Sequence, residues 1–232
     1  MPIRRGDGTG IESIRKGDGT QIAEVRKGDG TVLWQRDAIP DSEITQEIDF
    51  FERADVLAPY DSITNSQFIS EDTTTVFEGD KSLSTTSDGF DSSELISTSG
   101  LNHYPVRGET IRGYSYGNNA AQAGVIFGDS AANFYKATVD QHDDNFIAIT
   151  DESGNTIANS AATPVDSVWS VFEIEWGSPT ITVRIYDENG TLLASTSGDD
   201  SSYSGGSFGF FAGGGSTNET ANTCFWDLVG VK

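Results

Sequence analysis

The sequence lacks the features needed for a disulfide framework or a membrane span. Its 232 residues include a single cysteine, Cys224, so no intramolecular disulfide can form, and we expect Cys224 to be a small buried side chain. No apolar run approaches the roughly 20 residues that span a bilayer, and no apolar stretch typical of a secretory signal follows the early arginines. We therefore expect a chain that does not insert into membranes and that becomes extracellular only by lysis.

Positive charge is also scarce. The chain has 14 Lys and Arg against 36 Asp and Glu, which gives a net charge of −22 and argues against nucleic acid as a partner. The repulsion among these negative charges is best tolerated in high salt, because the Debye length falls to about 3 Å at 1 M. Disorder is a poor explanation, because 13 Phe, 4 Trp and 7 Tyr can supply a core. The composition therefore indicates a halophilic globular protein.

A short phrase, R-[RK]-G-D-G-T, occurs three times near the start with a period of 11 residues. Its Gly-Asp-Gly-Thr parts span residues 6–9, 17–20 and 28–31. Asp-Gly between two extended segments is a strong hairpin signal, so each copy predicts strand, tight turn and strand. Units this small cannot bury an apolar face alone and are expected to stack on each other or on other chains. The residues we expect to mediate this anchoring and oligomerisation are Ile3, Ile11, Ile14, Ile22, Val25, Leu33 and Trp34. The alternative is a flexible basic tail.

Charge divides the chain into two parts. Residues 1–36 carry about +2, whereas the rest of the chain carries about −24. A change of this size favours two parts with different neighbours. We therefore expect an attachment module over residues 1–36, a linker over 37–44, and a domain over 45–232 that we call the acidic body.

The sequence of the acidic body predicts many short strands separated by turn residues. This pattern is typical of an antiparallel sandwich or barrel. Two hairpins are predicted, one turning at Glu152 to Asn155 and one at Asn189-Gly190. In the second, alternation places Ile181, Val183 and Ile185 on one face. The clearest strands are expected at 110–117, 123–128, 133–140, 145–158, 170–176, 180–197 and 207–213.

Several motifs occur in an order that resembles the concanavalin A-like lectin and glucanase superfamily, and laminin-G-like jelly rolls in particular. They are Phe51-Glu52, an expected strand from Glu78 to Leu83, the Trp169 to Trp176 strand, and the closing run from Gly206 to Asp227. The resemblance covers residues 45–232. It implies an all-β jelly-roll sandwich, preceded here by the N-terminal hairpin repeats.

The resemblance also implies where ligands would bind. Glycans in such folds stack on aromatic rings and hydrogen-bond to amides, which makes the candidate glycan-binding residues Tyr114, Tyr116, Asn118, Asn119 and Tyr203. Calcium near the rim of the jelly roll would be held by oxygen ligands. The candidate metal ligands are Asp140, Asp143 and Asp144, in a cluster with His142. Chance clustering in so acidic a chain is the alternative, and no cofactor is expected to be required.

Catalysis is not expected. Superfamily members that hydrolyse glycans carry a motif similar to E-x-D-x-x-E on one strand. This sequence has no such triplet of acidic residues. Glu173 and Glu175 do share one face of a strand, so a cleaving pair is an alternative to an acidic surface. His103 and His142 lie far apart and no serine nucleophile motif accompanies them. We therefore assign no catalytic residue.

A repeated basic anchor before an acidic lectin-like sandwich resembles appendage proteins of tailed viruses, here of viruses that infect haloarchaea. The resemblance implies a virion structural protein on a capsid or tail, as a homo-oligomeric trimer or pentamer. The N-terminal repeats would contact other virion proteins, and the acidic body would contact a host surface glycan or glycoprotein. One alternative is a decoration protein without a ligand, and the other is a glycan hydrolase.

Overall fold

A computed structural model describes residues 24–26, 32–35, 43–87, 91–118, 122–140, 146–162, 168–213 and 222–232. Contacts divide the chain into two compact units, Met1–Pro40 and Asp41–Lys232, and each is described by itself. No helix in these described ranges is long and apolar enough to cross a membrane.

The described residues of the first unit form an antiparallel strand pair, β1 (Glu24–Arg26) and β2 (Val32–Gln35). Val25 lies opposite Trp34 in its register, and Leu33 lies in the same strand as Trp34. The third copy of the repeat therefore has the two paired strands that its pattern predicts, while its predicted Asp29-Gly30 turn lies outside the described residues. The expected anchoring residues of the first two copies, Ile3, Ile11, Ile14 and Ile22, lie outside the described residues.

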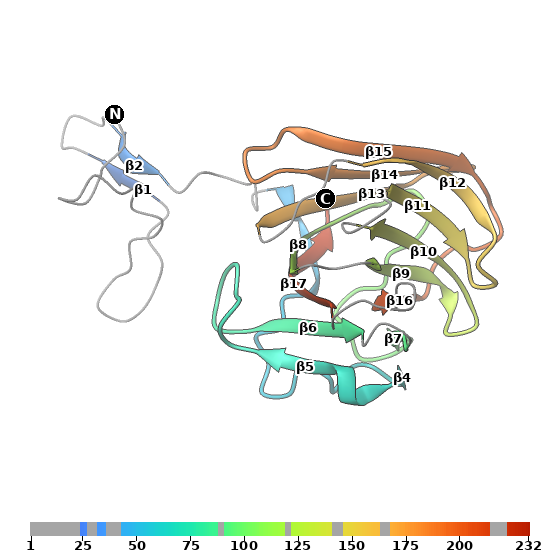
Figure 1. The fold of residues 1–232 in the computed structure, drawn as a ribbon, viewed down its shortest axis with the longest axis horizontal. Coiled ribbons are helices and arrows are strands. Elements are labelled where there is room, and N and C mark those ends of the chain that lie inside the picture. Colours follow the sequence, from blue (N-terminus) through green and yellow to red (C-terminus); the bar gives the residue numbers. More distant parts are fainter. Residues whose placement is uncertain are drawn as a thin grey trace. The chain divides into compact units, whose positions relative to one another are not determined.

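The second unit contains the acidic body and is built from two antiparallel sheets (Figure 1). The seven-stranded sheet runs in the order β12 (Thr156–Ala161), β11 (Phe146–Asp151), β10 (Asn133–Asp140), β9 (Gln122–Ser130), β16 (Ser207–Gly213), β7 (Ser93–Ser97) and β4 (Ser62–Thr64). The eight-stranded sheet runs in the order β15 (Leu192–Asp199), β14 (Thr180–Tyr186), β13 (Trp169–Trp176), β8 (Thr110–Asn118), β17 (Asn222–Val231), β6 (Ser82–Ser87) and β5 (Ile69–Asp72), with β3 (Gln46–Asp49) paired to β17. A short 3-10 helix, η2 (Ser66–Phe68), directly precedes β5. The expected all-β jelly-roll sandwich is confirmed.

The core lies between the sheets because the inward residues of nearly every strand are apolar. In β14 the predicted alternation is confirmed, since Ile181, Val183 and Ile185 are buried and the residues between them are partly exposed. Phe127 and Trp176 meet edge to face across the two sheets, with ring centroids 5.0 Å apart. Each such pair adds about 0.5–1.5 kcal/mol to the burial of its area.

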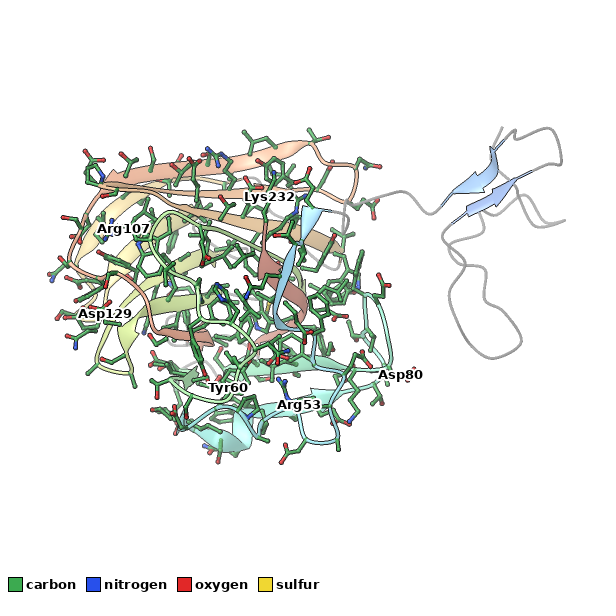
Figure 2. The ribbon with its side chains drawn as sticks, turned by 180° about the vertical axis from the view of Figure 1, so that it is seen from behind. Arg53, Tyr60, Asp80, Arg107, Asp129 and Lys232 are labelled. Atoms are coloured by element: carbon green, nitrogen blue, oxygen red, sulfur yellow. The ribbon has the colours of Figure 1, made fainter. Side chains whose placement is uncertain are left out.

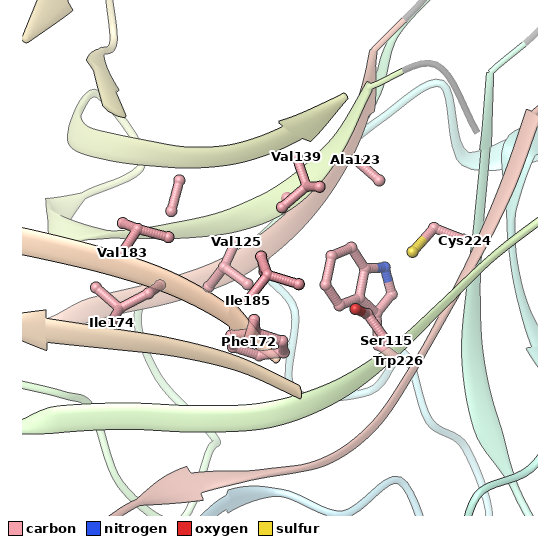
Figure 3. Close-up of a pocket in the computed structure, with 12 residues that line it drawn as sticks. Ser115, Ala123, Val125, Val139, Phe172, Ile174, Val183, Ile185, Cys224 and Trp226 are labelled. Atoms are coloured by element: carbon pink, nitrogen blue, oxygen red, sulfur yellow. The ribbon is translucent and has the colours of Figure 1, made fainter. Parts of the chain in front are cut away.

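A small apolar cavity lies inside the sandwich (Figure 3), lined in part by Val125, Phe172, Ile185 and Trp226. Its volume is about 20 Å³, little more than the space a single water needs. Cys224 also lines it and is buried, as expected of a small apolar side chain. A cavity of this size is too small to hold a sugar.

The two predicted hairpin turns are built alike. The Asp151 carboxylate accepts backbone hydrogen bonds from Ser153 and Asn155, and the Asp187 carboxylate accepts them from Asn189 and Thr191. The side-chain amide of Asn155, which also donates to Asp151, and the backbone donors lower the pKa of Asp151, and the backbone donors of Thr191 and Asn189 lower the pKa of Asp187. In each turn a glycine supplies the positive φ that the reversal requires.

The prediction of a strand from Glu78 to Leu83 is wrong for residues 78–81. β6 begins only at Ser82, and residues 73–81 form a loop on the eight-stranded sheet. One oxygen of a buried carboxylate, Asp227 Oδ2, explains the difference. Asp227 accepts the N–H groups of Phe77 and Glu78 at 2.9 and 3.1 Å, so these donors are satisfied without a neighbouring strand.

Candidate functional site

A groove of about 490 Å³ lies on the outer face of the seven-stranded sheet. The core takes Tyr135, Ala137 and Ile149 from β10 and β11, so the side chains between them must point outward. The hydroxyl and amide groups that line the groove come from Ser92, Gln122, Thr138, Thr150, Thr156 and Asn159. The sheet thus presents polar groups in a row on a face that none of the described strands covers.

One apolar side chain on the floor of the groove, Phe211, belongs to a cluster that is separate from the core. Ile96, Ile126, Phe134 and Phe211 form a second buried cluster. The Phe211 ring lies directly over Gly124, because a Cβ built at Gly124 would stand 2.5 Å from its Cε1 atom. Glycine at this position therefore lets an aromatic ring lie close to the sheet, and Phe211 lines the groove together with Phe146.

An ion pair crosses this floor. Lys136 on β10 donates from Nζ to Glu94 Oε1 on β7, and the two strands are separated by β9 and β16. The Lys136 ammonium also lies over two rings, 5.1 Å from the centroid of Phe211 and 5.6 Å from that of Phe134. Both side chains of the pair keep 23% of their surface exposed. Among the described residues that line the groove, Lys136 is the one with a charge.

The tyrosines expected to bind a glycan are not brought together. Tyr114 has no exposed surface because Phe77 stacks on it at 4.1 Å, so it cannot contact a sugar and is withdrawn as a candidate. Tyr116 lies on the outer face of the eight-stranded sheet, 5.6 Å from Trp169. Tyr203 lies between β15 and β16, where its hydroxyl donates to Glu152.

Tyr203 is held at one end of the sandwich by a loop with fixed backbone partners. Arg107 donates to the carbonyl oxygens of Gly177 and Tyr203, and the Asp129 carboxylate accepts from Ser204 N at 2.6 Å. Figure 2 shows Arg107 and Asp129 along the same edge of the body. Tyr203 therefore packs at this end and does not line the groove.

The remaining predicted ligands fall at or beyond the edge of the described residues. Asn118 ends β8 and Asp140 ends β10, and only their backbone is described. Asn119, His142, Asp143 and Asp144 lie outside the described residues. Across the part of the chain that is described, no group of three or more His, Cys, Asp and Glu could hold a metal ion.

Glu173 and Glu175 share the outer face of β13, as their spacing predicts, but both are paired with cations. Arg184 contacts Glu173 at 3.3 Å and Glu175 at 3.0 Å. Glu173 is 6% exposed and also meets Arg112 at 3.3 Å and Lys232 at 3.4 Å. The result is a structural ion network on the eight-stranded sheet, away from the groove.

Sequence reasoning missed the groove residues because it followed aromatic and amide residues in loops. The signal was present in the strands themselves. In "NFYKATVD" and "NFIAIT" every second residue enters the core, and the intervening Lys136, Thr138, Phe146 and Thr150 form a second face. What the sequence could not supply is the pairing of β10 with β11 that joins these residues.

Comparisons with known proteins agree with the fold. No protein-family model matches the chain, and no curated protein matches it in sequence. Among solved structures, the carbohydrate-binding module CBM66 from Bacillus subtilis is similar with a TM-score of 0.52 and 18% identity, over 71% of this chain and 91% of that one. A Bacillus subtilis protein of unknown function with a galectin-like fold has a TM-score of 0.52 and 10% identity, over 78% and 92% of the two chains. Lectin I-B4 from Griffonia simplicifolia has a TM-score of 0.50 and 12% identity, over 76% and 93%. The acidic body therefore shares its jelly-roll fold with these structures.

Proposed function

We propose that the acidic body binds carbohydrate and that the glycan lies in the groove on the seven-stranded sheet. One observation carries the proposal: an open groove of about 490 Å³ combines hydroxyl, amide and ammonium groups with aromatic rings. A sugar has the complementary surface, since its hydroxyls need hydrogen-bond partners and its C–H faces pack on rings. Two of the structures with this fold are a carbohydrate-binding module and a lectin, which favours the same class of ligand.

We favour binding without cleavage over the alternative of a glycan hydrolase. A hydrolase needs one carboxylate as acid and a second as nucleophile or base. Glu173 and Glu175 share Arg184 as a partner, and Glu173 has further cationic neighbours. Charges held in this way suit a structural role better than proton transfer.

We also propose that the chain is a virion appendage in which residues 1–36 attach or oligomerise the protein and the acidic body contacts a host surface glycan. The support comes from the sequence: a repeated segment of about +2 precedes a remainder, residues 37–232, of about −24. The antiparallel strand pair of the third copy, with Val25 opposite Trp34, is consistent with a unit that needs neighbours to bury its apolar residues.

A groove-filling substitution tests the carbohydrate proposal. Thr150→Trp would place an indole in the groove, and Thr182→Trp is the matched control on the outer face of the other sheet, where Thr182 is similarly half-buried. The full chain is assayed on an array of immobilised glycans in about 1 M salt, which screens its charge. We expect a saturable signal for the unmodified protein and for Thr182→Trp, and its loss for Thr150→Trp. Equal signals from both variants would contradict the site.

A further inference from the structure

The Lys136–Glu94 pair combines donors and acceptors beside the groove, which Lys136 itself lines. A lysine ammonium has three N–H donors, and the one hydrogen bond found for Lys136 among the described residues goes to Glu94 Oε1. Within the described residues the other carboxylate oxygen, Glu94 Oε2, has no hydrogen-bond partner. Each side chain is 23% exposed, so a ligand can reach both.

The floor of the groove holds this pair in place. The ammonium of Lys136 lies over the rings of Phe134 and Phe211, whose side chains are buried. Phe211 also lies directly opposite Glu94 in the register of β16 and β7. A lysine fixed by an ion pair and two rings loses less side-chain freedom when a ligand binds than a solvated lysine does.

We propose that this pair is the specificity determinant of the groove and that it selects a neutral sugar with two adjacent free hydroxyls. One hydroxyl accepts from Lys136 Nζ, and its neighbour donates to Glu94 Oε2. The inference rests on the proposed function, because it assigns a ligand class to the same groove.

Charge favours a neutral ligand over a uronic acid. The groove has one cation among its described lining residues, and Glu94 already neutralises it. A sugar carboxylate would have to displace Glu94 from Lys136 and approach a chain whose residues 37–232 carry a net charge of about −24. Two neutral hydroxyls use both partners and leave the ion pair intact. A neutral ligand is also compatible with the carboxylate beside Lys136, whereas that carboxylate would repel an acidic ligand.

The test uses the full chain and affinity electrophoresis in gels that contain one polysaccharide each. Dextran, mannan, xyloglucan and laminarin are the neutral probes, and polygalacturonate and alginate are the acidic probes. Glu94→Gln removes the charge and keeps the shape, and Lys136→Gln does the same for its partner. The matched control is Glu71→Gln, which breaks the Lys81–Glu71 pair on the eight-stranded sheet, where the Nζ to Oε2 distance is 2.8 Å. Thermal unfolding checks that each variant is folded.

We expect retention by at least one neutral polymer, with little change between low and high salt. Glu94→Gln and Lys136→Gln should each weaken it at least about tenfold, the usual loss for a hydrogen bond to a charged group, while Glu71→Gln leaves it unchanged. Retention only by acidic polymers, or unchanged retention in whichever pair variant folds, would overturn the inference while leaving a carbohydrate site. Failure of every polymer to retain the unmodified chain would overturn the proposed function as well.

Discussion

Replacing Tyr60 by phenylalanine would remove one hydrogen bond from a buried carboxylate and leave the aromatic packing in place. The Tyr60 hydroxyl donates to Asp49 Oδ2 at 2.7 Å, and Asp49 has no exposed surface. The same carboxylate accepts from Phe51 N at 2.8 Å and pairs with Arg53, which lies near Tyr60 in Figure 2. Asp49 thereby holds the turn at Phe51, whose φ of 61° is unusual for a residue other than glycine.

The size of the effect follows from the charge of the acceptor. A hydrogen bond to a charged group contributes about 1.5–3 kcal/mol, because its loss leaves a buried charge less well solvated. In a domain of this size each 1 kcal/mol shifts Tm by about 2–4 °C, so Tyr60→Phe should lower Tm by roughly 3–12 °C. Burial raises the pKa of Asp49, and loss of the Tyr60 donor should raise it further.

Urea unfolding in buffered molar salt at neutral pH measures the change, with Tyr104→Phe as the matched control. The Tyr104 hydroxyl meets Ser97 Oγ at 2.5 Å and accepts from Leu101 N at 3.1 Å, so both of its partners are neutral. Neutral hydrogen bonds contribute about 0.5–1.5 kcal/mol, and the control should cost less. If Tyr60→Phe cost no more than Tyr104→Phe, with equal m-values, the reasoning about the buried carboxylate would be refuted.

Two further predictions concern pH and the N-terminal repeats. Burial raises the pKa of Asp227 to about 7, so the folded protein keeps this proton to higher pH than the unfolded chain, and the free energy of unfolding should fall between pH 3.8 and about 7. At about 1.4 kcal/mol per pH unit the fall approaches an upper limit of about 4 kcal/mol, and a pH series of urea unfolding curves in which Asp227→Asn keeps the same slope would contradict it. Deletion of residues 1–36 should lower the oligomeric state, measured by light scattering as the number of chains per particle, while the acidic body stays folded in molar salt. An unchanged number of chains would rule out their role in oligomerisation.

Local chemistry explains why much of the fold could be predicted. The Asp151 and Asp187 turns depend on residues within five positions of one another, and strand alternation in β14 depends only on its own sequence. Tyr114 failed as a surface candidate because its exposure depends on a distant segment. Phe77 covers it, and the loop that carries Phe77 is held by Asp227, which lies 150 positions further along the chain.

The groove was beyond sequence reasoning for the same reason. The ion pair beside the groove joins Lys136 and Glu94 across two intervening strands. No local sequence pattern predicts the order of those strands. The role of Gly124 can also be recognised only in the structure, because the ring that it accommodates belongs to Phe211 on a neighbouring strand. Residues of a candidate site that lie on separate strands become neighbours only once the sheet order is known.

The central claim is that the outer face of the seven-stranded sheet binds carbohydrate, and the most direct measurement compares two tryptophan substitutions on opposite faces of the sandwich. Glycan-array binding of the full chain in molar salt should be lost in Thr150→Trp, which fills the groove, and kept in Thr182→Trp on the other sheet. If both variants bound glycans as the unmodified chain does, or if the unmodified chain bound none, the groove would not be a carbohydrate site and the account would be wrong.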